Sequence, residues 1–165
     1  MKKIKTLLLA IFVATLTAFS GNAQKVAHIN TEELISSMPE YKALQQKLEN
    51  LGNSYQEEIK NMENALKTKL QKYDQEASSQ TNETNMARQQ EVQLEAQKLE
   101  QYKATAMQDL QKQEQEGMRP ILEKAQKAIE EVANEQNIEY VINASALIVA
   151  KGKDLLPDVK AKLGI

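Results

Sequence analysis

The sequence has 165 residues, a formal net charge of −2 and no cysteine. The lack of cysteine excludes disulfides, cysteine metal sites, a cysteine nucleophile and lipid attachment through a lipobox cysteine. Acidic residues outnumber basic ones, 23 to 21, so the chain lacks the concentrated positive charge that nucleic acid selects, and no nucleic-acid partner is expected.

Residues 1–23 have the pattern of a secretory signal peptide. Three lysines precede an apolar stretch at 7–19, and small residues follow, ending at Ala23. The apolar stretch is shorter than a membrane-spanning helix, which favours cleavage over the alternative, an N-terminal membrane anchor. Cleavage after Ala23 predicts an exported periplasmic protein without stable membrane insertion. Loss of the three signal lysines makes its formal charge −5.

The residues after the signal peptide begin a small β-rich head, for which we expect residues 24–38 and 137–165. Residues 25–30 alternate in polarity and are rich in β-branched side chains, which predicts a short strand. Asn30 and Glu33 have the spacing of a capping box and predict a short helix from Glu32 to Ser37.

A long amphipathic helix is predicted from Pro39 to Ala77. Its apolar residues recur at spacings of four and three and form one stripe: Leu44, Leu48, Leu51, Tyr55, Ile59, Met62, Leu66, Leu70, Tyr73 and Ala77. This 11-residue period suits a straight or slightly right-handed seam. Because the stripe is narrow, the helix is expected to pack against a partner helix and leave most of its surface in water.

A second helix is predicted from Glu83 to Gln136, so that residues 39–136 form an antiparallel helical-hairpin arm. Turn-favouring residues at 78–82 mark the tip of this arm. The apolar stripe of the second helix is interrupted at 113–116, and Gly117 and Pro120 follow inside the helical stretch. Since proline removes a helical hydrogen bond, we interpret Gly117 and Pro120 as a kink or hinge of the arm.

The C-terminal residues predict two further strands and a helix. The strands are expected at 138–142 and 147–150, joined by a tight hairpin at 143–145, with the helix at 154–163. The fold class is therefore α+β and predominantly helical. Three short strands bury too little to stand alone, so the heads are expected to oligomerise into a closed barrel. The candidate oligomer interface residues are Val26, Ile29, Tyr140, Ile142, Leu147 and Val149.

The whole arrangement resembles the Skp/OmpH family of periplasmic chaperones. The resemblance rests on residues 25–34 after a signal peptide, on residues 138–147 with their Asn-Ala-Ser turn, and on the charged, glutamine-rich helical hairpin between them. It implies a homotrimer whose heads form a β-barrel and whose arms enclose a cavity. It further implies an ATP-independent holdase that binds unfolded outer-membrane proteins, with no cofactor. Residues 60–100 lack the excess of basic residues found in better-known members, so the resemblance is not extended to a lipopolysaccharide-binding site.

Flexible and amphipathic side chains of the arm are the candidate contacts for unfolded clients. They are Met62, Met86, Tyr102 and Met107. Methionine is polarizable and can repack against varied partners. The alternative is that these side chains seal the two helices of the arm to each other.

Other functions have weaker support in the sequence. His28 is the only histidine, and no nucleophile elbow, phosphate loop or paired-histidine metal motif is present, so neither an enzyme nor a metal site is expected. The main alternative is a structural coiled-coil spacer or tether of the cell envelope, which uses the same arms as rigid rods. Binding to a membrane surface is a third possibility, but the arm lacks the basic face that anionic lipid selects.

Overall fold

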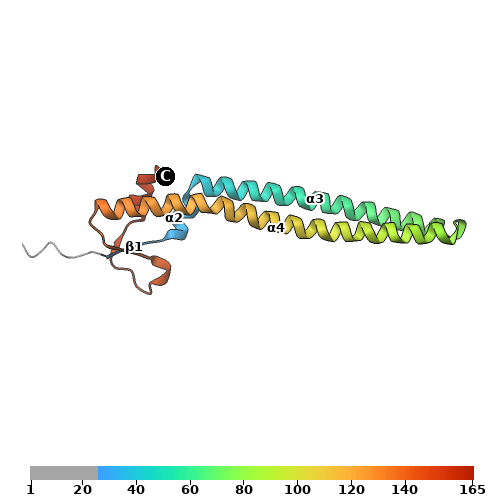
Figure 1. Cartoon of the computed structure of the whole chain (residues 1–165). Helices are drawn as coiled ribbons and strands as arrows, with labels where there is room; N and C mark the ends of the chain where they lie inside the picture. Colours follow the sequence, from blue (N-terminus) through green and yellow to red (C-terminus); the bar gives the residue numbers. More distant parts are fainter. Residues whose placement is uncertain (1–25) are drawn as a thin grey trace, which may run out of the picture. The chain divides into compact units, whose positions relative to one another are not determined.

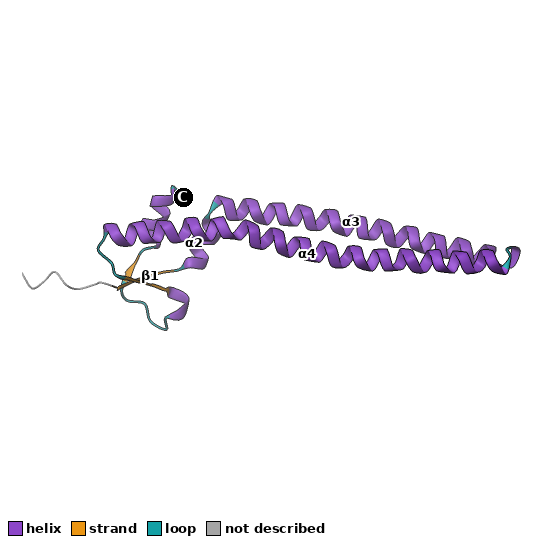
Figure 2. Cartoon of the chain, viewed as in Figure 1, coloured by secondary structure: helices purple, strands orange, loops and turns teal. Residues whose placement is uncertain are grey.

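The structure is a computed structural model that describes residues 26–165, so the predicted signal peptide lies outside the described residues. This part of the chain divides into two compact units. A head comprises residues 26–38 and 122–165, and an arm comprises residues 39–121. The sequence-based division placed the second boundary at residue 136. Figures 1 and 2 show the course of the chain and its secondary structure.

The head contains a parallel sheet of three short strands. The strands are β1 (Val26–Ile29), β2 (Tyr140–Asn143) and β3 (Lys153–Asp154), and their order in the sheet is β2-β1-β3. Both neighbours run parallel to β1. The predicted hairpin of two C-terminal strands is therefore wrong: residues 147–150 form no strand, and β2 and β3 are not neighbours.

The chain turns away after β2 for a local reason. The side chain of Asn143 accepts a hydrogen bond from the backbone N–H of Ser145 at 3.3 Å and begins the 3₁₀ turn η2 (Ala144–Ala146). An exposed loop then leads to β3 on the other side of β1. The loop crosses from one edge of β1 to the other because β2 and β3 lie on opposite sides of β1. A connection of this length is needed because parallel strands cannot be joined by a tight turn.

Two short helices and the C-terminal part of a long one cover one face of the sheet. They are α2 (Thr31–Ser37), α5 (Leu156–Leu163) and residues 122–135 of α4. The apolar core of the head lies among these elements: Ala27, Ile29, Leu34, Met38, Ala125, Ala128, Val132, Ala133, Ile138, Leu155, Leu156 and Val159. Burial of this set gives the head its own small hydrophobic core.

Hydrogen bonds fix the ends of the head helices. Asn30 accepts from the N–H of Glu33 at 3.0 Å, which confirms the predicted cap of α2. At the end of α4, Asn137 has a positive φ of 56°, and the N–H of Ile138 bonds to the carbonyl of Ala133 at 2.9 Å. This Schellman arrangement ends the helix and directs the chain into β2.

The arm consists of two antiparallel helices (Figure 1). They are α3 (Pro39–Glu76) and the first part of α4 (Asn82–Glu135), joined by the 3₁₀ turn η1 (Ala77–Ser79). The predicted helices and tip are confirmed to within a residue or two. At a rise of 1.5 Å per residue, α3 is about 57 Å long. None of the helices described between residues 26 and 165 is long and apolar enough to cross a membrane.

The predicted apolar stripe of α3 faces α4. All of its members are buried or half-buried except Leu70, and Leu44 is the buried residue of α3. On the arm part of α4, the buried residues are Leu99, Ala106 and Ile121. The seam therefore has few buried side chains for its length, and the two helices rely on additional polar contacts.

Candidate functional site

Polar side chains connect α3 and α4 along the arm. Lys47 donates to Gln113 at 2.9 Å, and Tyr55 donates to Asp109 at 2.7 Å. The hydrogen bond from Tyr55 to the Asp109 carboxylate raises the pKa of this tyrosine. Gln113 belongs to the segment that interrupts the apolar stripe, and here a polar pair takes the place of apolar packing.

The end of the arm near the tip holds a denser polar network. Lys69 pairs with both Glu91, at 2.7 Å, and Glu95, while the Tyr73 hydroxyl donates to Glu91 at 2.7 Å. Arg88 lies over the Tyr73 ring, 4.5 Å from its centroid. Hydrogen bonds from Lys69 and Tyr73 lower the pKa of Glu91, and its two carboxylate partners raise the pKa of Lys69. This network fixes the alignment of the helices at the tip.

Three apolar side chains of α4 take no part in the seam. Met86, Leu94 and Met107 are 64%, 57% and 73% exposed, and we call them the outer apolar row. They are exposed, whereas Leu99 and Ala106 of the same helix are buried. Large exposed apolar side chains spaced along one helix are available to bind a partner.

The predicted client contacts are thus divided between two environments. Met86 and Met107 belong to the outer apolar row, whereas Met62 and Tyr102 are half-buried. The Tyr102 ring meets the Tyr55 ring edge-on, with centroids 6.0 Å apart. Sequence reasoning missed Leu94, although its position two residues after Val92 prevents both side chains from facing α3.

The predicted hinge residues lie inside an uninterrupted helix. Pro120 is exposed within α4, which continues to Glu135. Gly117 has a packing role that the sequence did not predict, since a Cβ built on it would overlap the Leu44 side chain, with Cδ2 only 3.0 Å away. Glycine here lets the Leu44 side chain pack directly against the backbone of α4. Motion at this joint stays a prediction.

The face of the sheet opposite the helices presents apolar side chains. The strand register pairs Val26 with Tyr140 and His28 with Ile142, so these four side chains share one face. Val26, Tyr140 and Ile142 are exposed. The interface prediction for Ile29 needs correction, because its side chain is only 1% exposed and belongs to the head's own core.

The loop after η2 adds further exposed apolar residues to the head. Ile148 is fully exposed at 102%, and Val149 is 66% exposed, while Leu147 is half-buried. Leu147 and Val149 were predicted as interface residues, and Ile148 lies between them in the same apolar run. Residues 147–150, which include Ile148, were predicted to form a strand, but they pair with no strand within the described chain.

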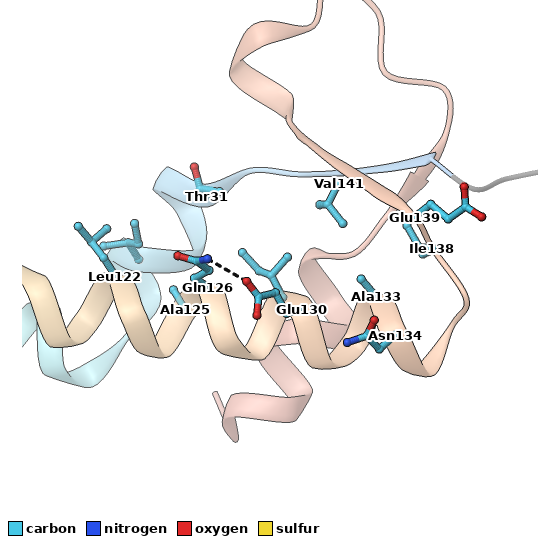
Figure 3. A pocket seen from close by; sticks show the side chains of 12 residues that line it. Thr31, Leu122, Ala125, Gln126, Glu130, Ala133, Asn134, Ile138, Glu139 and Val141 are labelled. Atoms are coloured by element: carbon cyan, nitrogen blue, oxygen red, sulfur yellow. Dashed lines mark hydrogen bonds between the residues drawn. The ribbon is translucent and has the colours of Figure 1, made fainter.

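The head also contains an open apolar groove of about 830 Å³ between α2, the C-terminal part of α4 and the start of β2 (Figure 3). We call it the head groove. Its lining comprises Thr31, Ile35, Leu122, Ala125, Gln126, Ile129, Glu130, Ala133, Asn134, Ile138, Glu139 and Val141. Most of the lining side chains are apolar, and the acidic Glu130 and Glu139 are the charged members.

Comparison with known proteins gives consistent matches. The family model described as "Outer membrane protein (OmpH-like)" matches residues 25–163. A protein named "Chaperone protein Skp" from Photorhabdus luminescens is 29% identical over 160 residues, covering 94% of this chain and 97% of that protein. A protein of the same name from Pectobacterium atrosepticum is 27% identical over 138 residues, covering 83% and 84%.

A solved structure shares the fold. The crystal structure of a Caulobacter crescentus protein described as an OmpH-like outer membrane chaperone aligns with a TM-score of 0.79. The alignment covers 87% of this chain and 86% of that one, at 15% sequence identity. A small sheet with long helical arms is therefore retained where the sequences have diverged widely.

Proposed function

The chain belongs to the OmpH-like outer membrane protein family, and on this premise we propose that it is an ATP-independent holdase chaperone of the periplasm. In this proposal it binds unfolded outer-membrane proteins after their export and prevents their aggregation. The related proteins are named chaperones, which supports a binding function rather than an enzymatic one.

The outer apolar row is the observation on this chain's own residues that best supports the proposal. A holdase needs apolar side chains that are exposed, adaptable and too dispersed to drive self-association. Met86, Leu94 and Met107 are exposed singly along α4, and the residues between them are mostly polar. Two of the three are methionines, whose flexible side chains can repack against different client segments.

We propose that the heads assemble the chains into a homotrimer. Support comes from the small core of each head, from the exposed sheet face with Val26, Tyr140 and Ile142, and from the open edges of β2 and β3. Exposed strand edges and apolar sheet faces are commonly covered by association. Export through cleavage after Ala23 is part of the same proposal.

The envelope spacer remains as the alternative outcome of the test. A break in the second helix was expected to argue against a rigid rod. Because α4 is one unbroken helix, that argument no longer applies. The outer apolar row favours the chaperone, because a spacer has no use for exposed methionine and leucine side chains along its arm.

The test uses the mature protein and a urea-unfolded outer-membrane β-barrel protein. The client is diluted into buffer with increasing amounts of the assembled protein, and light scattering is followed without ATP. We expect scattering to fall and to saturate at one client per assembled oligomer. Undiminished scattering with excess folded, assembled protein contradicts the holdase and supports the spacer.

A further inference from the structure

Methionine dominates the oxidation chemistry of this chain. The sequence contains six methionines and no cysteine. A peroxide oxidises the methionine thioether to a sulfoxide, which converts a flexible apolar side chain into a polar one. Because no thiol competes for the oxidant, the response of the chain to a peroxide depends on which of its methionines are exposed.

The methionines among the described residues differ widely in exposure. Met107 and Met86 are 73% and 64% exposed. Met62 and Met118 are half-buried in the arm, whereas Met38 is only 1% exposed in the core of the head. Since the oxidation of a sulfur side chain follows its exposure, a peroxide reaches Met86 and Met107 first.

The two exposed methionines can be oxidised without damage to the seam of the arm. A sulfoxide on Met86 or Met107 lies in water, where its oxygen is solvated and costs no buried contact. Met62 is different, because it belongs to the stripe of α3 that faces α4 and is half-buried there. Oxidation at Met86 and Met107 therefore changes the surface of the arm and leaves its packing intact.

The outer apolar row loses most of its apolar character when these thioethers are oxidised. Two of its three members are methionines, and Leu94 is then the remaining apolar side chain. At a rise of 1.5 Å per residue, Met86 and Met107 lie about 32 Å apart along α4. A bound client meets them as separate contacts, and the losses from two such distant positions add.

The oxidation needs only a peroxide as co-reactant. The sulfur lone pair attacks one oxygen of hydrogen peroxide, the S–O bond forms as the O–O bond breaks, and proton transfer releases water. Sulfur loses two electrons and the peroxide gains them. In the reverse step a methionine sulfoxide reductase uses a dithiol, which becomes a disulfide as the sulfoxide oxygen leaves as water.

We propose that Met86 and Met107 form a reversible oxidation site of the arm. Oxidation of these two thioethers by a peroxide weakens the binding of unfolded clients without unfolding the arm, and reduction restores it. This inference rests on the proposed holdase function and concerns the regulation of the same outer apolar row.

The first test locates the oxidation. The mature protein is treated with hydrogen peroxide, catalase removes the excess, and mass spectrometry of peptides measures the sulfoxide at each methionine. We expect Met86 and Met107 to be oxidised before Met62 and Met118, with Met38 last. Equal oxidation rates at the exposed and the half-buried methionines overturn the assignment of the site.

The second test measures holding in the client-dilution assay, with the client added after the peroxide is gone. We expect about tenfold more oxidised than unoxidised oligomer to be needed for the same suppression of scattering, because two apolar contacts have become polar. Methionine sulfoxide reductases A and B with dithiothreitol should restore the original suppression. Circular dichroism should show unchanged helix content. A loss of helix, or a loss of holding that the reductases do not reverse, overturns the proposal.

A matched pair of double variants separates the row from the other methionines of the arm. One carries Met86→Leu with Met107→Leu, and the control carries Met62→Leu with Met118→Leu. Each variant is compared with its own unoxidised sample. Holding by the first variant should be insensitive to peroxide, whereas holding by the control should fall as in the natural protein. Equal sensitivity of the two variants overturns the role of the row.

The same assays distinguish this inference from the function on which it rests. If the natural protein suppresses scattering equally well before and after oxidation of Met86 and Met107, the oxidation site is overturned and the holdase stands. If the unoxidised, folded and assembled protein does not suppress scattering, the holdase is overturned and this inference with it.

Discussion

Replacing Gly117 with alanine should destabilise the arm, whereas the same change at Gly52 should stabilise it. Both glycines are half-buried and lie inside long helices. They differ in their surroundings, since a Cβ at Gly52 meets no atom within 4 Å, while one at Gly117 overlaps the buried Leu44 side chain. The pair separates the steric effect from the effect on helix propensity.

The magnitudes follow from two opposing terms. Alanine is favoured over glycine in a helix interior by about 0.8–1.0 kcal/mol, which is the expected gain at Gly52. Overpacking a filled site costs about 1–3 kcal/mol, so the net change at Gly117 is a loss of up to about 2 kcal/mol. The free energies of unfolding of the two variants should therefore differ by about 1–3 kcal/mol.

Urea unfolding at a fixed protein concentration measures this difference, since the stability of an oligomer depends on concentration. As a further control, Gly117→Ala in a Leu44→Ala background should become stabilising by about 1 kcal/mol, because the overlapping side chain is gone. Equal stabilisation by Gly52→Ala and Gly117→Ala refutes the close packing of Leu44 on α4.

Three further changes test other parts of the structure. The hydrogen bond from Gln136 lowers the pKa of Asp158. The ionised Asp158 carboxylate therefore stabilises the fold at neutral pH, and this stabilisation disappears as pH falls through the folded-state pKa. Asp158→Asn should flatten the acid limb of a plot of unfolding free energy against pH, and an unchanged acid limb contradicts this. Tyr55→Phe removes a bond to the Asp109 carboxylate and should cost about 1 kcal/mol in urea unfolding. Pro120→Ala should stabilise α4 and, if Pro120 acts in a hinge, reduce holding of large clients; unchanged holding in a scattering assay removes the hinge.

The arm was predictable because its signals are local. Spacings of four and three define the stripe of α3, and turn-forming residues mark the tip. The packing of Gly117 against Leu44 was not predictable in the same way, because it joins residues far apart in the sequence. From sequence alone, a glycine inside a helical pattern indicates a less stable stretch of helix. Its packing role is evident only when the side chain that contacts it from the other helix is known.

The head was predicted less well because strand pairing is non-local. The composition of residues 147–150 indicates a strand, but within one chain β1 pairs with β2 and β3, which leaves this segment exposed. Ile29 was assigned to an interface because alternation alone does not say which face of a strand the chain's own helices cover. Among the client candidates, exposure separates Met86 and Met107 from the half-buried Met62.

The most direct measurement of the central claim compares two triple variants in the client-dilution assay. One makes the outer apolar row polar through Met86→Gln, Leu94→Gln and Met107→Gln, and the other keeps it apolar through Met86→Leu, Leu94→Met and Met107→Leu. Both retain good helix formers, so the arm should stay folded. The account predicts that the polar variant suppresses scattering at least tenfold less well per assembled oligomer, while the apolar variant matches the natural protein. Equal suppression by both variants contradicts the claim that the outer apolar row binds clients.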